Sequence, residues 1–342
     1  MMKYEILTLL REAAPDYVSG AELGERFGFS RTAAWKYIKE LRAEGYTIEA
    51  ASRKGYRLIA SDGPINSFEI ENDLGTSIVG REVLCYDALA STNVQAARLA
   101  AEGCVDGLTV MASRQTQGRG RLGRSWESTP DKGIYLSIVL RPPMAPAETQ
   151  IFTLAAAVAA VRAIYGAAGL ETGIKWPNDI VAGGKKLCGI LLEMNCETDR
   201  VNYIVLGIGI NYSHEASDFP DELQDRATSV LMELNDLNSR SACTGAKDNS
   251  GGRLALIRAL LREMDAVLLD ILDGKNSVIL DMWREYSATI GKEVRFTLRD
   301  VEYTGTAIDI TEDGRLLVDC SDGIRRGLIS GEVSVRGMYG YI

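Results

Sequence analysis

Helical spacing of apolar residues dominates the start of the chain. Apolar residues between positions 6 and 10 give a first helix one buried face, and Pro15 ends this helix. The segment SGAE at 19–22 has the capping-box pattern, which predicts a second helix that runs through Phe27. After a tight turn, Ser30 stands where it can cap a third helix. The pattern therefore predicts two helices, a turn and a further helix.

The third predicted helix separates apolar from polar side chains. Ala34, Ile38 and Leu41 recur at helical spacing and should face a core, and two alternating runs around Arg53-Lys54-Gly55 then predict a β-hairpin. This order is typical of a winged helix-turn-helix, whose third helix can enter a major groove. A small protein-docking domain is the alternative. The side chains expected to meet DNA are Arg31, Thr32, Trp35, Lys36, Lys39, Arg53 and Lys54.

The middle of the chain alternates strand-like and helix-like patterns after the linker SDGPINS at 61–67. We expect strands at Val83–Tyr86, Leu108–Ala112, Ile134–Leu140, Ile190–Met194 and Val201–Ile210. Helices are expected at Asn93–Ala101, Glu148–Ala168, Arg253–Leu272 and Ser277–Ser287, with a flexible insert at 240–252. The pattern predicts an α+β domain around a mixed sheet.

The last segment consists of short alternating runs separated by turn residues, which predict a small SH3-like β-barrel. We therefore expect three domains with the boundaries 1–62, 68–288 and 289–342.

Composition and charge exclude several classes of function. Residues 1–60 hold 10 Lys and Arg against 8 Asp and Glu, a net charge of +2, whereas the whole chain carries −9. The six cysteines contain no CxxC pair and His214 is the single histidine, so we expect neither a zinc site, a disulfide framework nor a histidine-based triad. The apolar stretch near 154–170 is interrupted by Arg162 and fits a buried helix, and no signal peptide is expected, which favours the cytoplasm.

A cationic, glycine-rich loop, QTQGRGRLGRSW at 115–126, carries the clearest chemical signal. Its glycines fit the dinucleotide motif GxGxxG, but that motif requires a helix at its third glycine, and here Pro130 and a strand follow. A nucleic-acid tail also fits poorly, because the loop lies between two predicted strands. The remaining interpretation is a loop that closes over a compact polyanion such as a phosphate.

Other polar segments agree with an anion site. KWPND at 175–179 follows a strand, and a turn at Gly183-Gly184 can bring Lys186 back beside Lys175 and Asp179. GIGIN at 207–211 ends a buried strand at Asn211, which can contact a purine or a phosphate. STN at 91–93 is most simply a helix N-cap, and it also offers three hydrogen-bonding side chains to a polar small molecule.

Together these motifs resemble the biotin–protein ligases, in particular the bifunctional kind that also represses the biotin operon. STN, GRGRLGR, KWPND, KKLCGIL and GIGIN stand in that family's order, and the winged helix and SH3-like segment complete its layout around a class II synthetase-like catalytic domain. Lipoate ligases share the fold but lack the arginine-rich signature. A departure is Trp35, which stands where a small or polar residue would fit a recognition helix more easily.

The resemblance implies roles for individual residues. Biotin would contact Ser91, Thr92, Asn93, Gln115, Gly118, Arg119, Gly120, Arg121 and Lys186. ATP or the adenylate would contact Arg124, Trp126, Lys175, Asn178 and Asn211. Lys186, Arg119 and Arg121, with Mg²⁺, would neutralise charge during adenylation, and Asp179 would orient the acceptor amine or take its proton. The segment 212–229 would be a loop that orders on the adenylate.

The function implied is formation of biotinyl-5'-AMP from biotin and ATP, then transfer of biotin to a lysine of a biotin carboxyl carrier protein. Operator DNA would be a second partner, bound by a homodimer that the adenylate promotes, with no membrane partner. Two alternatives remain open: a lipoate or octanoate–protein ligase of the same fold, and a ligand-sensing repressor without catalysis.

Overall fold

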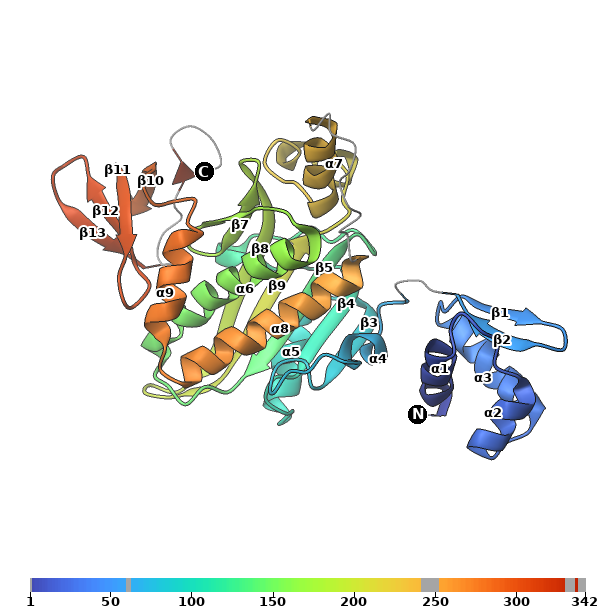
Figure 1. Cartoon of the computed structure of the whole chain (residues 1–342). Coiled ribbons are helices and arrows are strands. Elements are labelled where there is room, and N and C mark those ends of the chain that lie inside the picture. The colour runs from blue at the N-terminus through green and yellow to red at the C-terminus, as the bar shows by residue number, and fades with distance from the viewer. Residues whose placement is uncertain (1, 60–62, 241–251, 330–335, 338–342) are drawn as a thin grey trace. The chain divides into compact units, whose positions relative to one another are not determined.

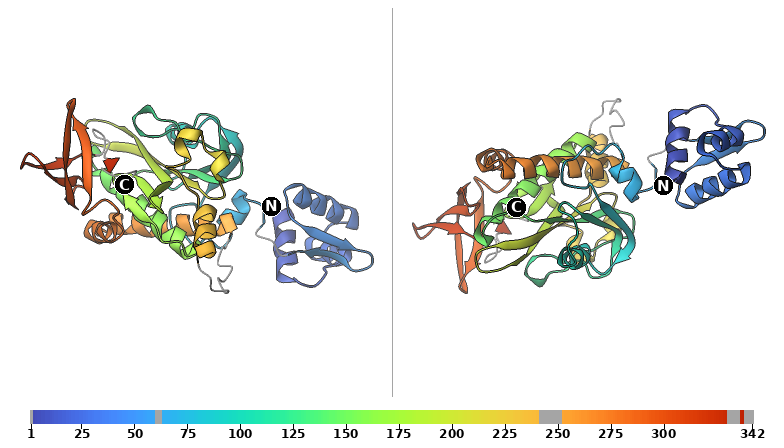
Figure 2. Two further views of the ribbon diagram at one scale, coloured as in Figure 1. Left: turned by 90° about the horizontal axis from the view of Figure 1, so that it is seen from above. Right: turned by 90° about the horizontal axis from the view of Figure 1, so that it is seen from below.

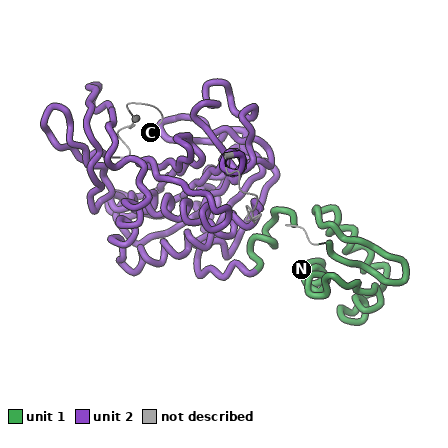
Figure 3. Tube along the Cα trace, turned by 45° about the horizontal axis from the view of Figure 1, so that its top comes forward, with its two compact units in different colours: residues 1–72 green, residues 73–342 purple. Residues whose placement is uncertain are grey.

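The computed structural model describes residues 2–59, 63–240, 252–329 and 336–337 (Figure 1). The chain divides into two compact units, residues 1–72 and 73–342, which Figure 3 shows in different colours.

The first unit contains the expected winged helix-turn-helix. Ser19 Oγ accepts a hydrogen bond from Glu22 N at 3.0 Å, and Ser30 Oγ accepts one from Ala33 N at 3.3 Å, so both predicted caps are present. Apolar side chains of the three main helices form one buried core with the hairpin. The elements are α1 (Met2–Glu12), α2 (Gly20–Phe27), α3 (Arg31–Ala43), β1 (Ile48–Ala51), β2 (Gly55–Leu58) and α4 (Ser67–Glu71).

Helix α4 packs on this unit, beyond the end of the linker expected at 61–67. Glu69 is 2% exposed and accepts hydrogen bonds from Arg11 Nη2 at 2.7 Å and Tyr46 Oη at 2.9 Å. The ring of Phe68 stacks on Tyr4 with centroids 4.2 Å apart. These contacts extend the first compact unit to Asn72, past the boundary expected at 62.

The second unit is built on a mixed sheet in which seven described strands run in the order β3-β4-β5-β9-β8-β7-β6. β3 and β4 are parallel and the other neighbours are antiparallel. The strands are β3 (Val83–Leu89), β4 (Thr109–Gln115), β5 (Gly133–Leu140), β6 (Gly173–Lys175), β7 (Asp179–Ala182), β8 (Lys185–Cys196) and β9 (Val201–Asn211).

Helices cover both faces of this sheet. α5 (Thr92–Ala101) lies on one face, whereas α6 (Gln150–Ala168) and α8 (Gly252–Leu272) pack together on the other (Figure 2). The segment Pro146–Ala168 is long and apolar enough to cross a membrane, but 78% of its apolar 18-residue window is buried, as expected for a core helix. α9 (Asn276–Glu285) leads into the C-terminal strands.

The C-terminal strands form an antiparallel sheet in the order β13-β12-β11-β10-β14. They are β10 (Glu293–Leu298), β11 (Val301–Ile310), β12 (Leu316–Cys320), β13 (Arg325–Leu328) and β14 (Arg336–Gly337). Trp176 of the KWPND motif connects this sheet to the large sheet, because its indole Nε1 donates to Gly314 O at 3.3 Å and its backbone N donates to Thr289 Oγ1 at 2.9 Å.

The long elements of the second unit lie where the sequence predicts them, and the short ones were missed. β7 follows KWPND directly, and α7 (Val230–Arg240) runs up to the expected insert at 240–252. Most of that insert, including Cys243, lies outside the described residues.

Candidate functional site

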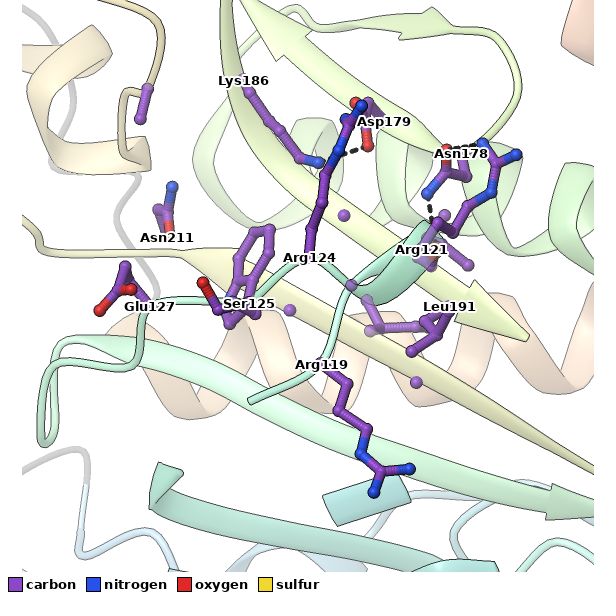
Figure 4. A pocket seen from close by; sticks show the side chains of 18 of the residues that line it. Arg119, Arg121, Arg124, Ser125, Glu127, Asn178, Asp179, Lys186, Leu191 and Asn211 are labelled. Carbon is purple, nitrogen blue, oxygen red and sulfur yellow. Dashed lines mark hydrogen bonds and ion pairs between the residues drawn. The ribbon is translucent and has the colours of Figure 1, made fainter. Parts of the chain in front are cut away.

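A cavity of about 980 Å³ opens on the α5 face of the large sheet (Figure 4). Such a volume suits a ligand of nucleotide size. Of the residues expected to bind small molecules, all but Gly118 line it, and Gly118 lines a second cavity beneath the same loop. The first cavity brings together Ser91, Thr92, Asn93, Gln115, Arg119, Gly120, Arg121, Arg124, Trp126, Lys175, Asn178, Asp179, Lys186 and Asn211.

The STN segment and Gln115 form a connected polar floor. Gln115 Oε1 accepts hydrogen bonds from Thr92 N at 2.8 Å and from Thr92 Oγ1 at 3.1 Å. Ser137 Oγ, on β5, donates to Asn93 Oδ1 at 2.6 Å and lies 2.8 Å from Thr92 Oγ1. The floor is therefore organised by the protein itself, which fixes the direction of each polar group.

Ser91 differs from the helix N-cap that the sequence suggests. It occupies the N-cap position of α5, but its side chain makes no capping hydrogen bond. The residue is 3% exposed and lines the cavity. Ser91 is thus the N-cap residue by position, and it lines the cavity without capping the helix through its side chain.

The arginine-rich loop is a tight turn and not a phosphate-binding helix start. A single 3₁₀ turn, η1 (Arg121–Gly123), follows the first glycines, and β5 comes next in the chain. This is the geometry that excludes the dinucleotide motif. Gly120 N donates to Arg124 O at 2.7 Å, and Trp126 N donates to Gly118 O at 3.0 Å. These backbone hydrogen bonds fold the loop back on itself.

Arg121 enters the site from this loop. Its Nη1 donates to Asn178 Oδ1 at 2.9 Å, and Asn178 Nδ2 donates to Ile190 O at 2.7 Å. Burial lowers the pKa of Arg121, a desolvation that the nearby Asp179 carboxylate opposes. Asn178 therefore uses both ends of its amide to hold the loop on β8.

The three loop arginines point in different directions. In Figure 4, Arg124 reaches toward Asp179 and Lys186, whereas Arg119 extends away from them. Arg119 Nη1 instead lies 3.6 Å from Glu193 Oε1. In this structure Arg119 therefore lies on the other side of the turn from Lys186, because the loop turns between residues 119 and 121.

Lys186 meets Asp179 across the β7–β8 hairpin, as the sequence predicts. Lys186 Nζ lies 2.6 Å from Asp179 Oδ1, and Lys175 pairs with Asp179 in the register of β6 and β7. Lys175 is 7% exposed and lines the same cavity. The arrangement places two lysines and one carboxylate at the position where a phosphate can be neutralised.

Trp126 lies on a platform of glycines in the sheet. A Cβ on Gly209 would come within 2.7 Å of Trp126 Cε2, and one on Gly189 within 2.7 Å of Cζ3. Lys186 Nζ is 5.4 Å from the centre of the ring. The glycines of GIGIN and KKLCGIL are therefore required for close approach of an aromatic group.

The segment 212–229 closes one side of the cavity. Asn211 Nδ2 donates to Thr228 O at 3.0 Å, and Thr228 N donates to Lys186 O at 2.9 Å. The single histidine, His214, is 2% exposed and its Nε2 is 3.2 Å from Tyr135 Oη. Burial lowers the pKa of His214 to about 4, so the ring is neutral at physiological pH.

Sequence patterns missed several lining or supporting residues. Ser137 is a polar residue in the apolar run GIYLSIVL, a signal that could have identified it. Glu193 lies on β8, two residues beyond KKLCGIL, and reaches the site only through strand register. Arg295 lines the cavity from β10, which no local pattern could indicate.

The residues expected to meet DNA lie on the surface of the first unit. Arg31, Thr32, Lys36 and Lys39 are exposed on α3, and Arg53 and Lys54 are exposed at the hairpin turn. Trp35 is 54% exposed, with Lys39 Nζ 5.4 Å from its ring centre. Trp35 is thus available to a partner and does not belong to the core.

Comparison with known proteins identifies the class of protein that this fold and site define. Residues 89–211 match the biotin/lipoate A/B protein ligase family, residues 3–57 an HTH domain, and residues 289–336 the biotin protein ligase C-terminal domain. The chain is similar to the bifunctional ligase/repressor BirA of Bacillus subtilis, with 38% identity over 95% of this chain and 96% of the relative. The Escherichia coli BirA is 28% identical over 94% of each chain.

A solved structure agrees with these matches. The biotin protein ligase from Aquifex aeolicus, in complex with biotin and ATP, aligns with a TM-score of 0.60 at 25% identity, covering 75% of this chain and 99% of that one. The chain belongs to the family of bifunctional biotin ligase/repressors. It is a biotin–[acetyl-CoA-carboxylase] ligase that carries a helix-turn-helix repressor domain.

Proposed function

We propose that the cavity of the second unit makes biotinyl-5'-AMP and that Lys186 carries this step. The observation behind the proposal is the convergence of Lys186, Lys175 and Arg124 around Asp179 in a cavity of nucleotide size. A carboxylate oxygen of biotin attacks the α-phosphorus of ATP, and pyrophosphate leaves. Both reactants are anionic, so cations at the reacting phosphate lower the barrier.

Biotin is assigned to the polar floor and the nucleotide to the glycine platform. Ser91, Thr92 and Gln115 offer hydrogen-bonding groups to the ureido ring, and Gly118, Gly120 and Arg121 belong to the loop above it. Asn93 and Asn178 are engaged by protein groups, so we assign them to shaping the site. Trp126 is assigned to cover adenosine, with Asn211 at the nucleotide side.

Mg²⁺ would enter with ATP. Among the described residues, no group of three or more His, Cys, Asp or Glu side chains could hold a metal ion. Mg²⁺ is commonly held by substrate phosphates with one or two carboxylates, and Asp179 is placed to serve as such a carboxylate. The ion would supply further neutralisation of the phosphates.

Transfer completes the reaction on a carrier protein. The ε-amine of a carrier lysine attacks the acyl carbon of the anhydride, AMP leaves, and the amine loses a proton. Asp179 is assigned to orient that amine or accept its proton. Because water would destroy the anhydride, the loop at 118–126 has to exclude it until the carrier arrives.

Repression is assigned to the first unit and to a homodimer that the adenylate promotes. A single winged helix with a net charge of +2 can neutralise few phosphates, so one copy should bind DNA weakly. Two copies would double the contacts and require paired half-sites. Operator DNA and the carrier protein would both be met in the cytoplasm, so we assign the chain to that compartment.

The test is exchange of labelled pyrophosphate into ATP by the purified full-length protein. Exchange that needs biotin and Mg²⁺ supports the proposal. Exchange with lipoate and none with biotin would indicate a lipoate ligase instead. Tight biotin binding without any exchange would indicate a sensor that does not catalyse.

A further inference from the structure

Glu193 faces two motif residues with its two carboxylate oxygens. It lies on β8, outside all the motifs that the sequence indicates. Its Oε2 accepts a hydrogen bond from Asn93 Nδ2 at 2.7 Å, and its Oε1 lies 3.6 Å from Arg119 Nη1. One side chain therefore connects the polar floor to the arginine-rich loop.

The floor side of this connection is rigid. Asn93 is 4% exposed, and its Oδ1 accepts the hydrogen bond from Ser137 Oγ at 2.6 Å. Its amide rests on Gly207, where a Cβ would lie 2.1 Å from Asn93 Oδ1. Because Asn93 has no room to move, it fixes the position of the Glu193 carboxylate.

The loop side is exposed to solvent at Arg119, whereas Asn178 holds Arg121 on the other side of the turn. The Arg119 side chain is 54% exposed, and the loop residues 118–126 are held to one another by the Gly120–Arg124 and Trp126–Gly118 backbone hydrogen bonds. A movement of Arg119 should therefore move the whole turn, including Trp126. Figure 4 shows that Arg119 itself points away from Lys186 and Asp179.

We propose that Glu193 is a positioning residue that holds the arginine-rich loop closed over the adenylate, and that Arg119 serves as the loop's anchor rather than as a counter-charge for phosphate. The inference rests on the proposed function. The loop arginines then have different roles. Arg121 and Arg124 lie on the side of the reacting phosphate, whereas Arg119 attaches the loop to the polar floor through Glu193.

Two substitutions separate the two contacts. Glu193→Gln keeps an oxygen that can accept from Asn93 but removes the charge opposite Arg119. Glu193→Ala removes both contacts. Exposed ion pairs have small effects, so we expect Glu193→Gln to release adenylate about three- to fivefold faster, with the KM for biotin within about twofold of wild type. Glu193→Ala should in addition raise the KM for biotin, because Asn93 Nδ2 loses its shorter hydrogen bond and keeps Leu191 O at 3.4 Å.

The matched control is Glu197→Gln. Glu197 follows β8 and pairs with Arg200 at 3.4 Å, with both side chains exposed. Its variant should release adenylate at the wild-type rate. The double variant Glu193→Gln/Arg119→Gln should release adenylate no faster than either single variant, because the two changes break one contact.

A second readout does not depend on catalysis. Trypsin cleaves after the arginines of an open loop, so Glu193→Gln should be cut between residues 119 and 124 about three- to fivefold faster than wild type without any ligand. Equal cleavage and equal adenylate release in wild type and Glu193→Gln would overturn the inference, and so would additive effects in the double variant. Failure of the proposed function would appear separately, as wild-type protein that forms no adenylate.

Discussion

Lys186 Nζ and Asp179 Oδ1 lie 2.6 Å apart, on opposite strands of one hairpin. The two residues belong to different sequence motifs, and the turn at Gly183-Gly184 brings them together. Without ligand, the carboxylate neutralises the ammonium group. A phosphate that enters the site can replace the carboxylate as the partner of the ammonium group. The pair therefore keeps Lys186 available for an anionic substrate, and Lys186 is not left unpaired before the substrate binds.

Replacing Lys186 with alanine should nearly abolish adenylate formation while leaving the fold intact. One lost charge-assisted contact at a reacting phosphate costs about 3 kcal/mol, or roughly a hundredfold in rate. Pyrophosphate exchange measures the effect. Lys292→Ala is the control, since Lys292 is exposed and does not line the cavity. Exchange by Lys186→Ala within a few-fold of wild type would remove Lys186 from the site.

Gly209→Ala should weaken ATP binding more than biotin binding. The new Cβ would lie 2.7 Å from Trp126 Cε2, so the indole has to leave its platform. Loss of one well-placed aromatic contact corresponds to about 1 kcal/mol, and we expect the KM for ATP to rise roughly five- to tenfold. Gly166→Ala is the control, because a Cβ there meets nothing within 4 Å. An unchanged KM for ATP would show that the platform does not serve the nucleotide.

His214 should make the second unit less stable as the pH falls. Its folded pKa is about 4, below the ordinary value of 6.5, so the unfolded state binds the proton more readily. Stability is therefore complete above pH 6.5 and declines toward pH 4, with a loss of about 2 kcal/mol between pH 7 and pH 5. Urea unfolding at both pH values measures this loss. His214→Gln should show a smaller decrease over this range, and an identical decrease would contradict the assignment to His214.

Helix α4 should belong to the DNA-binding unit in solution. A chain that begins at residue 63 keeps α4 but lacks Tyr4, Arg11 and Tyr46, so Phe68 and Glu69 lose the partners described above. We expect proteases to trim this chain to about residue 72, whereas a chain that begins at 73 should resist. Both should keep ligase activity and lose operator binding. Protection of residues 63–72 in the chain that begins at residue 63 would show that α4 packs elsewhere.

The long elements could be predicted from the sequence because their apolar periodicity extends over many residues. β5 and β9 are continuous apolar runs bounded by turn residues, and α6 is buried along most of its length. α4 and β6 are too short for a period to be visible, with five and three residues. Their existence depends on contacts with distant segments.

The motifs predicted which residues form the site better than they predicted where the side chains of these residues point. The sequence could indicate that Lys186 returns to Asp179, since a hairpin of known size connects them. It could not indicate that Arg119 turns away from Arg121, because that depends on the backbone of η1, where Leu122 adopts a φ of 55°. Glu193 enters through strand register, which local patterns do not determine.

We propose that one cavity, in the second unit, controls both catalysis and repression. Ordering of the loops at 118–126 and 212–229 by the adenylate would change the surface on which a second copy associates. A preference of about 3 kcal/mol for the dimer would tighten association roughly a hundredfold. Analytical ultracentrifugation of the full-length protein, without ligand and with biotinyl-5'-AMP, measures this most directly. We expect association about a hundredfold tighter with the adenylate. Equal association constants in the two states would rule out this link between catalysis and repression, whatever the ligase activity.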